Sequence, residues 1–299
     1  MNSSRKNNTN KPTSNRANSK SKTGISSDKK FVKPAKNSET KKAYQPKSYK
    51  PEFREKKEKI SNPDDGIRLN KFISNSGVCS RREADELIKT GVIQVNGKAM
   101  TEMGYKVMPT DTVQFDGRHL TAEKPVYVLL NKPKGYISTT SDEKMRKTVM
   151  DLVADATPYR LFPVGRLDRP TTGVLLLTND GHMTKKLTHP SFGIKKIYHV
   201  TLDKKLTNDD LNKIKEGVWL EEGKAEVDAI SFIEGKSRNE VGLEIHIGWN
   251  RVIRRMFFKL GYEVTLLDRV MFAGLTKKNL KRGFWRILTE QEVSNLKML

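Results

Sequence analysis

The sequence predicts an α+β fold with a mixed or antiparallel sheet in its C-terminal part. From residue 123 onward, many short strand-like segments alternate irregularly with helix-like ones, which is typical of that class. No repeat of about 20–50 residues is visible, so a solenoid or propeller is not expected. The composition also changes near residue 65. We therefore expect three parts, at residues 1–65, 66–122 and 123–299.

Charge and cysteine content narrow the class of protein. The 299 residues include 57 Lys and Arg against 35 Asp and Glu, a formal net charge of +22, which favours a polyanionic partner. The single cysteine, Cys79, excludes an intramolecular disulfide framework and a zinc site built from several cysteines. No apolar run approaches the ~18 residues of a membrane helix, and the first residues lack a signal-peptide core. We expect a cytoplasmic protein with no membrane partner.

Residues 1–65 are predicted to form a disordered basic arm. They carry 18 Lys and Arg against 7 Asp and Glu, and only 11 residues of the hydrophobic set. Such a segment buries too little apolar surface to offset the entropy lost on ordering. Two interpretations stay open with equal weight, a salt-sensitive tether for RNA and a solubilising tail without further function.

Residues 66–122 are predicted to form a small module of two helices followed by short strands. Apolar residues spaced by three and four from Leu69 indicate the first helix, and Ser80 with Glu83 forms a capping box for the second. Asn96-Gly97 predicts a hairpin turn. Basic residues surround the helix pair and suit either phosphate contacts or a solvated surface; the four that we single out are Arg68, Lys71, Arg81 and Arg82.

In the third part, a polar loop with the sequence GRLDRPTT lies between two apolar segments that read as strands, at 161–164 and 173–178. Loops of this kind project side chains from a rigid platform and often carry function. Residues 194–202 read as a strand with Tyr198 on one face. A helix is predicted at 250–260 and a strand at 263–274.

The sequence lacks the motifs that are typical of most classes of enzyme. The sequence has five histidines but no HExxH, no phosphate-binding glycine loop and no nucleophile elbow, so we expect neither a metal site nor a cofactor. What remains is Asp168, flanked by Arg166 and Arg169. Positive neighbours favour an ionised carboxylate, which suits a nucleophile. The same arrangement suits a structural salt bridge, and the residues alone favour that interpretation.

Two stretches resemble known families. RLNKFISNSGVCSRREADELIKTGVIQVNGK is similar to the small RNA-binding domain named after a ribosomal small-subunit protein, the alpha-L motif. NKPKG, GRLDRPTTGVLLLTNDG, HPSFGIKKIYHV and NRVIRRMF follow in order, and residues 66–299 resemble the bacterial rRNA pseudouridine synthases of the RsuA/RluB/RluE/RluF family, most closely the RluB type. The resemblance implies the pseudouridine synthase fold and an isomerase that converts uridine to pseudouridine in ribosomal RNA, with large-subunit RNA expected.

The resemblance also implies roles for particular residues. Asp168 aligns with the essential aspartate, acting as a nucleophile or as an anion that stabilises the detached sugar, and Tyr198 aligns with the tyrosine that stacks on the target base. Arg254 aligns with the arginine that pairs with the aspartate. Substrate contacts are expected from Arg166, Arg169, Arg251, Arg255 and Leu267.

Some expectations have competitors. The core of a strand is the default place for Tyr198 and Leu267, and small-subunit RNA is the alternative substrate. A catalytically silent ribosome-assembly factor on the same fold and a DNA-binding protein are further alternatives. The chain departs from the family pattern at Val252, where glutamine is usual, and at Trp249. We expect the protein to act as a monomer.

Overall fold

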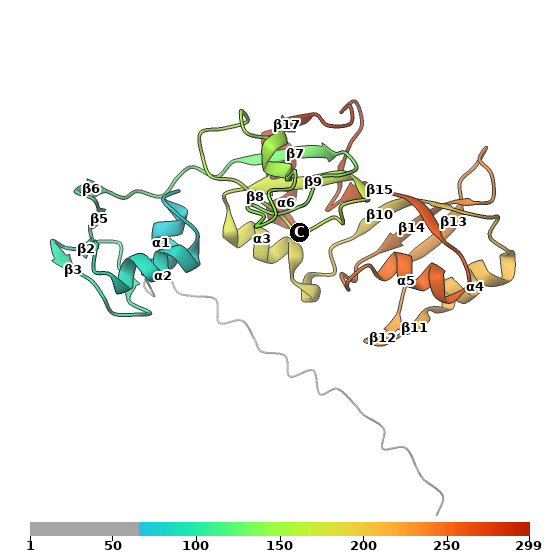
Figure 1. Ribbon diagram of the computed structural model, residues 1–299, viewed down its shortest axis with the longest axis horizontal. Helices are drawn as coiled ribbons and strands as arrows, with labels where there is room; N and C mark the ends of the chain where they lie inside the picture. The colour runs from blue at the N-terminus through green and yellow to red at the C-terminus, as the bar shows by residue number, and fades with distance from the viewer. Residues whose placement is uncertain (1–65) are drawn as a thin grey trace, which may run out of the picture. The chain divides into compact units, whose positions relative to one another are not determined.

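The computed structural model of the protein describes residues 66–299 (Figure 1). The basic arm predicted for residues 1–65 lies outside the described residues and stays a prediction. Within residues 66–299, no helix combines the length and apolar character that crossing a membrane requires.

The first part consists of a helix pair and short strands, as predicted. The helices α1 (Leu69–Asn75) and α2 (Arg81–Lys89) pack on each other around a core that includes Ile73 and Ile88. A four-stranded sheet has the order β3-β2-β5-β6, and a separate pair joins β1 to β4. The strands are β1 (Ile67–Arg68), β2 (Ile93–Val95), β3 (Lys98–Ala99), β4 (Lys106–Val107), β5 (Val113–Phe115) and β6 (Arg118–His119).

The capping box of α2 is confirmed. The Ser80 hydroxyl accepts a hydrogen bond from the Glu83 backbone N–H at 3.3 Å, and the Glu83 carboxylate accepts one from the Ser80 N–H at 2.7 Å. Arg68, Arg81 and Arg82 are exposed and Lys71 is half-buried. These positions suit contact with phosphate, but they suit a solvated surface equally, so the RNA contacts stay a prediction.

The second part is built on one large sheet, and its mixed character confirms the predicted class. The strands follow the order β13-β14-β10-β15-β9-β7-β17, with β16 paired to β15 and β8 to β9. Only the β15–β9 pair is parallel among the described strands of this sheet. The strands are β7 (Tyr127–Lys132), β8 (Phe162–Pro163), β9 (Thr172–Thr178), β10 (Lys196–Leu202), β13 (Ala229–Phe232), β14 (Glu240–Ile245), β15 (Val264–Phe272), β16 (Leu275–Thr276) and β17 (Trp285–Ile287).

Both faces of the central strands are buried. In β9, Leu175 and Leu177 belong to one apolar cluster, and Val174 and Leu176 belong to the other. This explains why the strand reads as a continuous apolar run rather than an alternating one. The hairpin of β11 (Val218–Leu220) and β12 (Gly223–Ala225) stands apart from this sheet.

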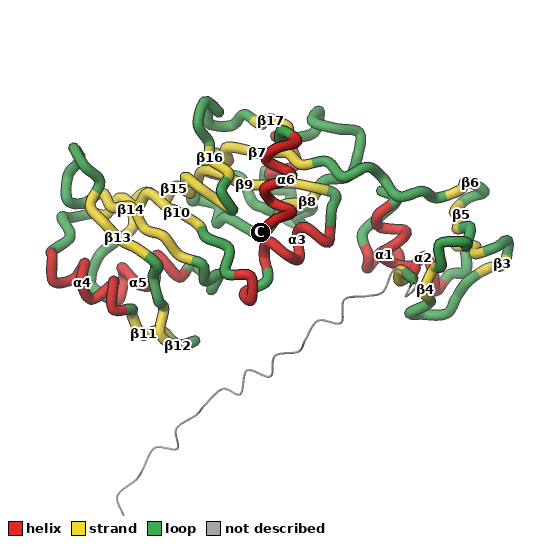
Figure 2. Tube along the Cα trace, turned by 180° about the vertical axis from the view of Figure 1, so that it is seen from behind, coloured by secondary structure: helices red, strands yellow, loops and turns green. Residues whose placement is uncertain are grey.

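Helices cover the two faces. Figure 2 shows α3 and α6 close together and α4 and α5 near the other end of the sheet. The helices α4 and α5 supply Leu211 and Phe257 to the first cluster, whereas α3 and α6 supply Leu187 and Leu296 to the second. Their bounds are α3 (Gly181–Thr188), α4 (Asn208–Glu216), α5 (Val252–Lys259) and α6 (Glu290–Met298), and the 3-10 helices are η2 (Val149–Leu152) and η3 (Pro190–Phe192).

The helix α3 was not predicted from the sequence. Only Met183 and Leu187 are buried on it, so its apolar pattern is short. The available signal was its cap, because the Asp180 carboxylate accepts hydrogen bonds from the backbone N–H groups of His182 and Met183.

We expect Gly173→Ala to destabilise the sheet strongly. Gly173 has a φ of +106°, and a Cβ at this position would lie 2.1 Å from the carbonyl oxygen of Arg269 on the parallel neighbour. The clash is with backbone, so the unfolding free energy is expected to fall by more than about 2 kcal/mol, measured by urea denaturation. Gly181→Ala is the control, because it has no atom within 4 Å and an ordinary φ. Equal stability of the two variants would contradict the account.

Candidate active site

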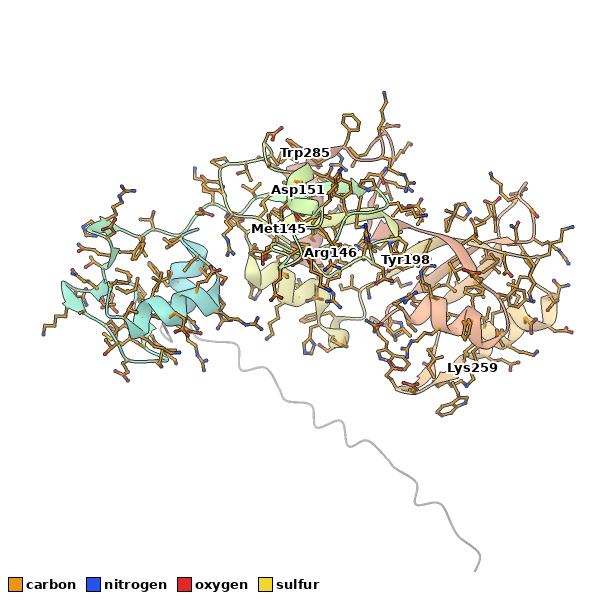
Figure 3. The ribbon with its side chains drawn as sticks, viewed as in Figure 1. Met145, Arg146, Asp151, Tyr198, Lys259 and Trp285 are labelled. Carbon is orange, nitrogen blue, oxygen red and sulfur yellow. The ribbon has the colours of Figure 1, made fainter. Side chains whose placement is uncertain are left out.

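The candidate site is a pocket of about 300 Å³ beside the central strands, a size that suits one small ligand. Its walls come from the β8–β9 loop, the end of α3, β10, the segment between β14 and α5, and β15. Asp168, Tyr198 and Leu267 line it together, although they lie up to 99 residues apart in the sequence. Figure 3 labels Tyr198 on β10.

Lys132 anchors the backbone of the loop that carries Asp168. This lysine is the last residue of β7 and is fully buried. Its ammonium donates hydrogen bonds to the backbone carbonyls of Asp168 at 3.1 Å and Thr171 at 2.8 Å. Longer contacts reach the carbonyls of Arg169 at 3.5 Å and Pro133 at 3.3 Å. Lys132 therefore connects the end of β7 to the loop backbone at Asp168 and at the residues that follow it.

Burial lowers the pKa of the Lys132 ammonium to about 8. The negative charge of Asp168 opposes this shift, and the positive charge of Arg269 adds to it. The cause is desolvation, which disfavours the charged form.

The segment after β7 adds further ties to the loop. The Ser138 hydroxyl donates to the Leu167 carbonyl at 3.1 Å and accepts from the Leu167 N–H at 3.2 Å. The Gly135 N–H donates to the Arg169 carbonyl at 2.9 Å, and the Arg169 side chain donates back to the Gly135 carbonyl at 3.1 Å. In the described part of the chain, no hydrogen bond engages the Asp168 carboxylate itself. The backbone of the loop is thus fixed while its carboxylate stays available.

Tyr198 lies on the buried face of β10, directly across from Arg269 on β15. The Arg269 side chain is almost fully buried; its Nε donates to the Val174 carbonyl at 2.7 Å and its guanidinium lies 4.6 Å from the Phe272 ring centroid. Burial lowers the pKa of the Arg269 guanidinium, and the nearby Tyr198 phenol opposes that shift. Tyr198 therefore belongs to both the core and the pocket.

Arg254 differs in part from expectation. It lies on α5, and its guanidinium donates to the Val264 carbonyl at 2.6 Å, while its buried Nε has no partner among the described residues. No ion pair within 4 Å joins it to Asp168 in residues 66–299, and it does not line the pocket. Burial lowers the pKa of Arg254 and the charge of Asp168 raises it, so the two groups interact at longer range.

The other predicted contacts divide into two groups. Arg166 and Arg251 are exposed and line the pocket. Arg255 does not line it, because its guanidinium forms two hydrogen bonds of 2.9 and 2.6 Å with the Glu222 carboxylate. Arg169 also lies outside the lining residues, since its side chain turns back to Gly135. Arg166 and Arg251 thus lie at the pocket and Arg169 and Arg255 outside its lining, and the substrate contacts of all four stay a prediction.

Three basic residues in or beside the pocket were missed by the sequence analysis. Lys132 and Arg269 are described above. The third, Lys196, lines the pocket and donates to the His246 carbonyl, and burial lowers its pKa to about 8. Lys132 stands in the NKPKG motif and Lys196 two residues before Tyr198, so proximity to recognised motifs was the available signal. Among residues 66–299, no group of His, Cys, Asp and Glu is arranged to hold a metal ion.

The sequence matches models of two known protein families. Residues 126–259 match the sequence model of RNA pseudouridylate synthases, and residues 67–113 match that of the S4 domain. The chain is 44% identical to the ribosomal large subunit pseudouridine synthase B of Bacillus subtilis, over 78% of this chain and 96% of that protein.

Two further pseudouridine synthases are also similar to this chain. The chain is 37% identical to the dual-specificity RNA pseudouridine synthase RluF of Escherichia coli K12, over 78% of this chain and 79% of that one. A crystal structure of a pseudouridylate synthase is 28% identical, with a TM-score of 0.54, and the match covers 77% of this chain and all of the solved one.

Proposed function

Because the chain belongs to the RsuA/RluB/RluE/RluF family of RNA pseudouridine synthases, we propose that it modifies large-subunit ribosomal RNA and that Asp168 is its nucleophile. The isomerase class and the fold predicted from the sequence are confirmed by this membership. Support for the large subunit comes from the identity to the Bacillus subtilis enzyme, whose name specifies that subunit. The observation that carries the assignment of the site is the meeting of Asp168 and Tyr198 in one pocket.

In the proposed reaction, the bond between uracil N1 and ribose C1′ breaks, and the bonding electrons leave with the base. The Asp168 carboxylate either bonds covalently during this step or stabilises the cation left on the sugar. The uracil turns, C5 bonds to C1′, and the C5 proton is lost while N1 gains one. Reactant and product are isomers, so no external oxidant, reductant or group donor is required.

Tyr198 is proposed to stack on the target base. A uridine in folded RNA must leave its base stack to enter a pocket. Stacking of the base on an aromatic side chain contributes ~1–3 kcal/mol of binding free energy and replaces part of what is lost. Tyr198 is 8% exposed and lies across from Arg269 on β15. Leu267 lies two residues before Arg269 on β15 and contributes an apolar wall. Arg254 is proposed to interact with Asp168 by longer-range electrostatic attraction rather than through a direct ion pair.

The large-subunit proposal is tested by locating the product. Purified protein is incubated separately with large-subunit and small-subunit rRNA, and pseudouridines are mapped by reverse transcription after carbodiimide treatment. We expect new stops in large-subunit RNA only. Stops confined to small-subunit RNA would show that small-subunit rRNA is the substrate instead. The absence of stops in either RNA would favour a catalytically silent assembly factor.

Deletion of residues 1–65 is expected to weaken RNA binding at low salt and to flatten its salt dependence. The segment carries a net charge of +11, from 18 basic and 7 acidic residues. The slope of log K against log salt falls by about one unit for each phosphate that the protein no longer neutralises, so filter binding over a salt series measures the effect. An unchanged slope would make the segment a bystander in RNA binding.

A further inference from the structure

The pocket contains an aromatic side chain that the proposed reaction does not use. Trp249 lies in the segment between β14 and α5 and lines the same pocket as Asp168 and Tyr198. It is half-buried and packs against the main apolar cluster. Its backbone is fixed at the start of α5, because its carbonyl accepts from the Val252 N–H at 3.3 Å.

The position of Trp249 is close to the rim of the pocket. Its neighbours Gly248, Asn250 and Arg251 are exposed, and all three line the pocket. Tyr198 and Leu267, in contrast, are 8% and 6% exposed and form the floor. The indole also approaches the start of β12, where a Cβ placed on Gly223 would lie 3.7 Å from Cη2.

The other two tryptophans do not share this position. The chain has three, and neither Trp219 nor Trp285 lines the pocket. Trp219 is 65% exposed on β11, and Trp285 lies on β17, well away from Tyr198 in Figure 3. Packing against the core explains Trp285, but it does not require the indole of Trp249 to reach the pocket.

We propose that Trp249 stacks on the base next to the target uridine in the RNA strand, while the exposed Arg251 contacts the phosphate of that nucleotide. This inference rests on the proposed function. Extrusion of one base exposes the faces of its neighbours, and an aromatic ring at the rim covers one of them. A cation two residues away on the same rim suits the backbone of that nucleotide. Trp249 thereby positions the strand and selects RNA with an unstacked neighbour.

Substitutions of Trp249 separate stacking from packing. Trp249→Leu keeps apolar volume but has no aromatic face, whereas Trp249→Phe keeps both. We expect Trp249→Leu to lower kcat/KM for large-subunit rRNA by about 5- to 150-fold, mainly through KM. Trp249→Phe should restore most of it, and Trp219→Leu should match wild type. Equal kcat/KM for the Leu and Phe variants would overturn the proposal, and thermal unfolding checks that all variants fold.

A binding measurement provides a readout independent of turnover. In the Trp219→Phe, Trp285→Phe, Asp168→Asn variant, Trp249 is the sole tryptophan. Stacking predicts that its fluorescence falls saturably as large-subunit rRNA is added, and unchanged fluorescence at saturating RNA would overturn the proposal. Wild-type protein that makes no pseudouridine would refute the proposed function, whereas the quenching experiment would still report on Trp249.

Discussion

Replacing Asp168 by asparagine is expected to abolish pseudouridine formation and to leave RNA affinity unchanged. Asparagine has the same shape, and the carboxylate takes part in no hydrogen bond in the described part of the chain, so the exchange breaks no contact there. The ties of the loop use the backbone carbonyl of Asp168, which the variant retains. Loss of a nucleophile reduces turnover by more than about 1,000-fold. Single-turnover assays and filter binding on the same RNA measure the two quantities.

Residual turnover above about a tenth of the wild-type rate would contradict the assignment of Asp168 as a nucleophile. The urea midpoint of the variant serves as the control for folding. An unchanged midpoint with abolished turnover locates the effect in the chemistry, because the loop remains attached to Lys132.

Replacing Lys132 by methionine is expected to reduce kcat by about 100-fold, although Lys132 does not line the pocket. Methionine fills similar space but cannot donate to the carbonyls of Asp168 and Thr171, so the loop loses its main anchor. A shift of about 1 Å in a reacting group is enough for a loss of this size. Lys134→Met is the matched control, because Lys134 is exposed in the same NKPKG motif. A kcat at saturating RNA that is equal in the two variants would contradict the anchoring role.

The same lysine gives a pH prediction with two opposite trends. Its pKa is about 8 in the folded protein, below the ordinary 10.5, so the unfolded chain binds more protons between these values. The unfolding free energy therefore rises with pH through this window. The anchoring ammonium loses its charge in the same window, so kcat is expected to fall above about pH 8.

Lys196 has a similarly lowered pKa and contributes to the rise in stability. Lys132→Met should therefore reduce the rise without removing it. Urea denaturation at several pH values between 7 and 10 measures this difference. An identical pH dependence in wild type and variant would contradict the burial of a charged Lys132.

Local signals in the sequence predicted much of the fold. The capping box at Ser80 and the Asn96-Gly97 turn depend on residues a few positions apart, and both are present. The loop with Asp168 and the strand with Tyr198 were also located, because apolar runs bound them. The pattern of β9 did not reveal which strands pair with it, since a fully buried strand has no polar face.

What could not be predicted depends on contacts between distant segments. Lys132 meets carbonyls 36 and 39 residues later in the chain, and nothing in its own surroundings marks it as buried. The orientation of Arg254 toward the Val264 carbonyl follows from how α5 packs on β15. Arg255 turns to Glu222 because the β11–β12 hairpin lies beside α5. A sequence motif indicates which helix or strand carries such a residue. The way that helix or strand packs on its neighbours determines which atoms the side chain contacts.

The most direct test of the central claim is the release of tritium from rRNA labelled at uridine C5. The C5 hydrogen leaves only when the base is attached again through C5, so release reports the complete isomerisation. We predict release from large-subunit rRNA with the wild-type protein and none with Asp168→Asn. Release that persists in Asp168→Asn, or none from any rRNA with the wild-type protein, would contradict the account.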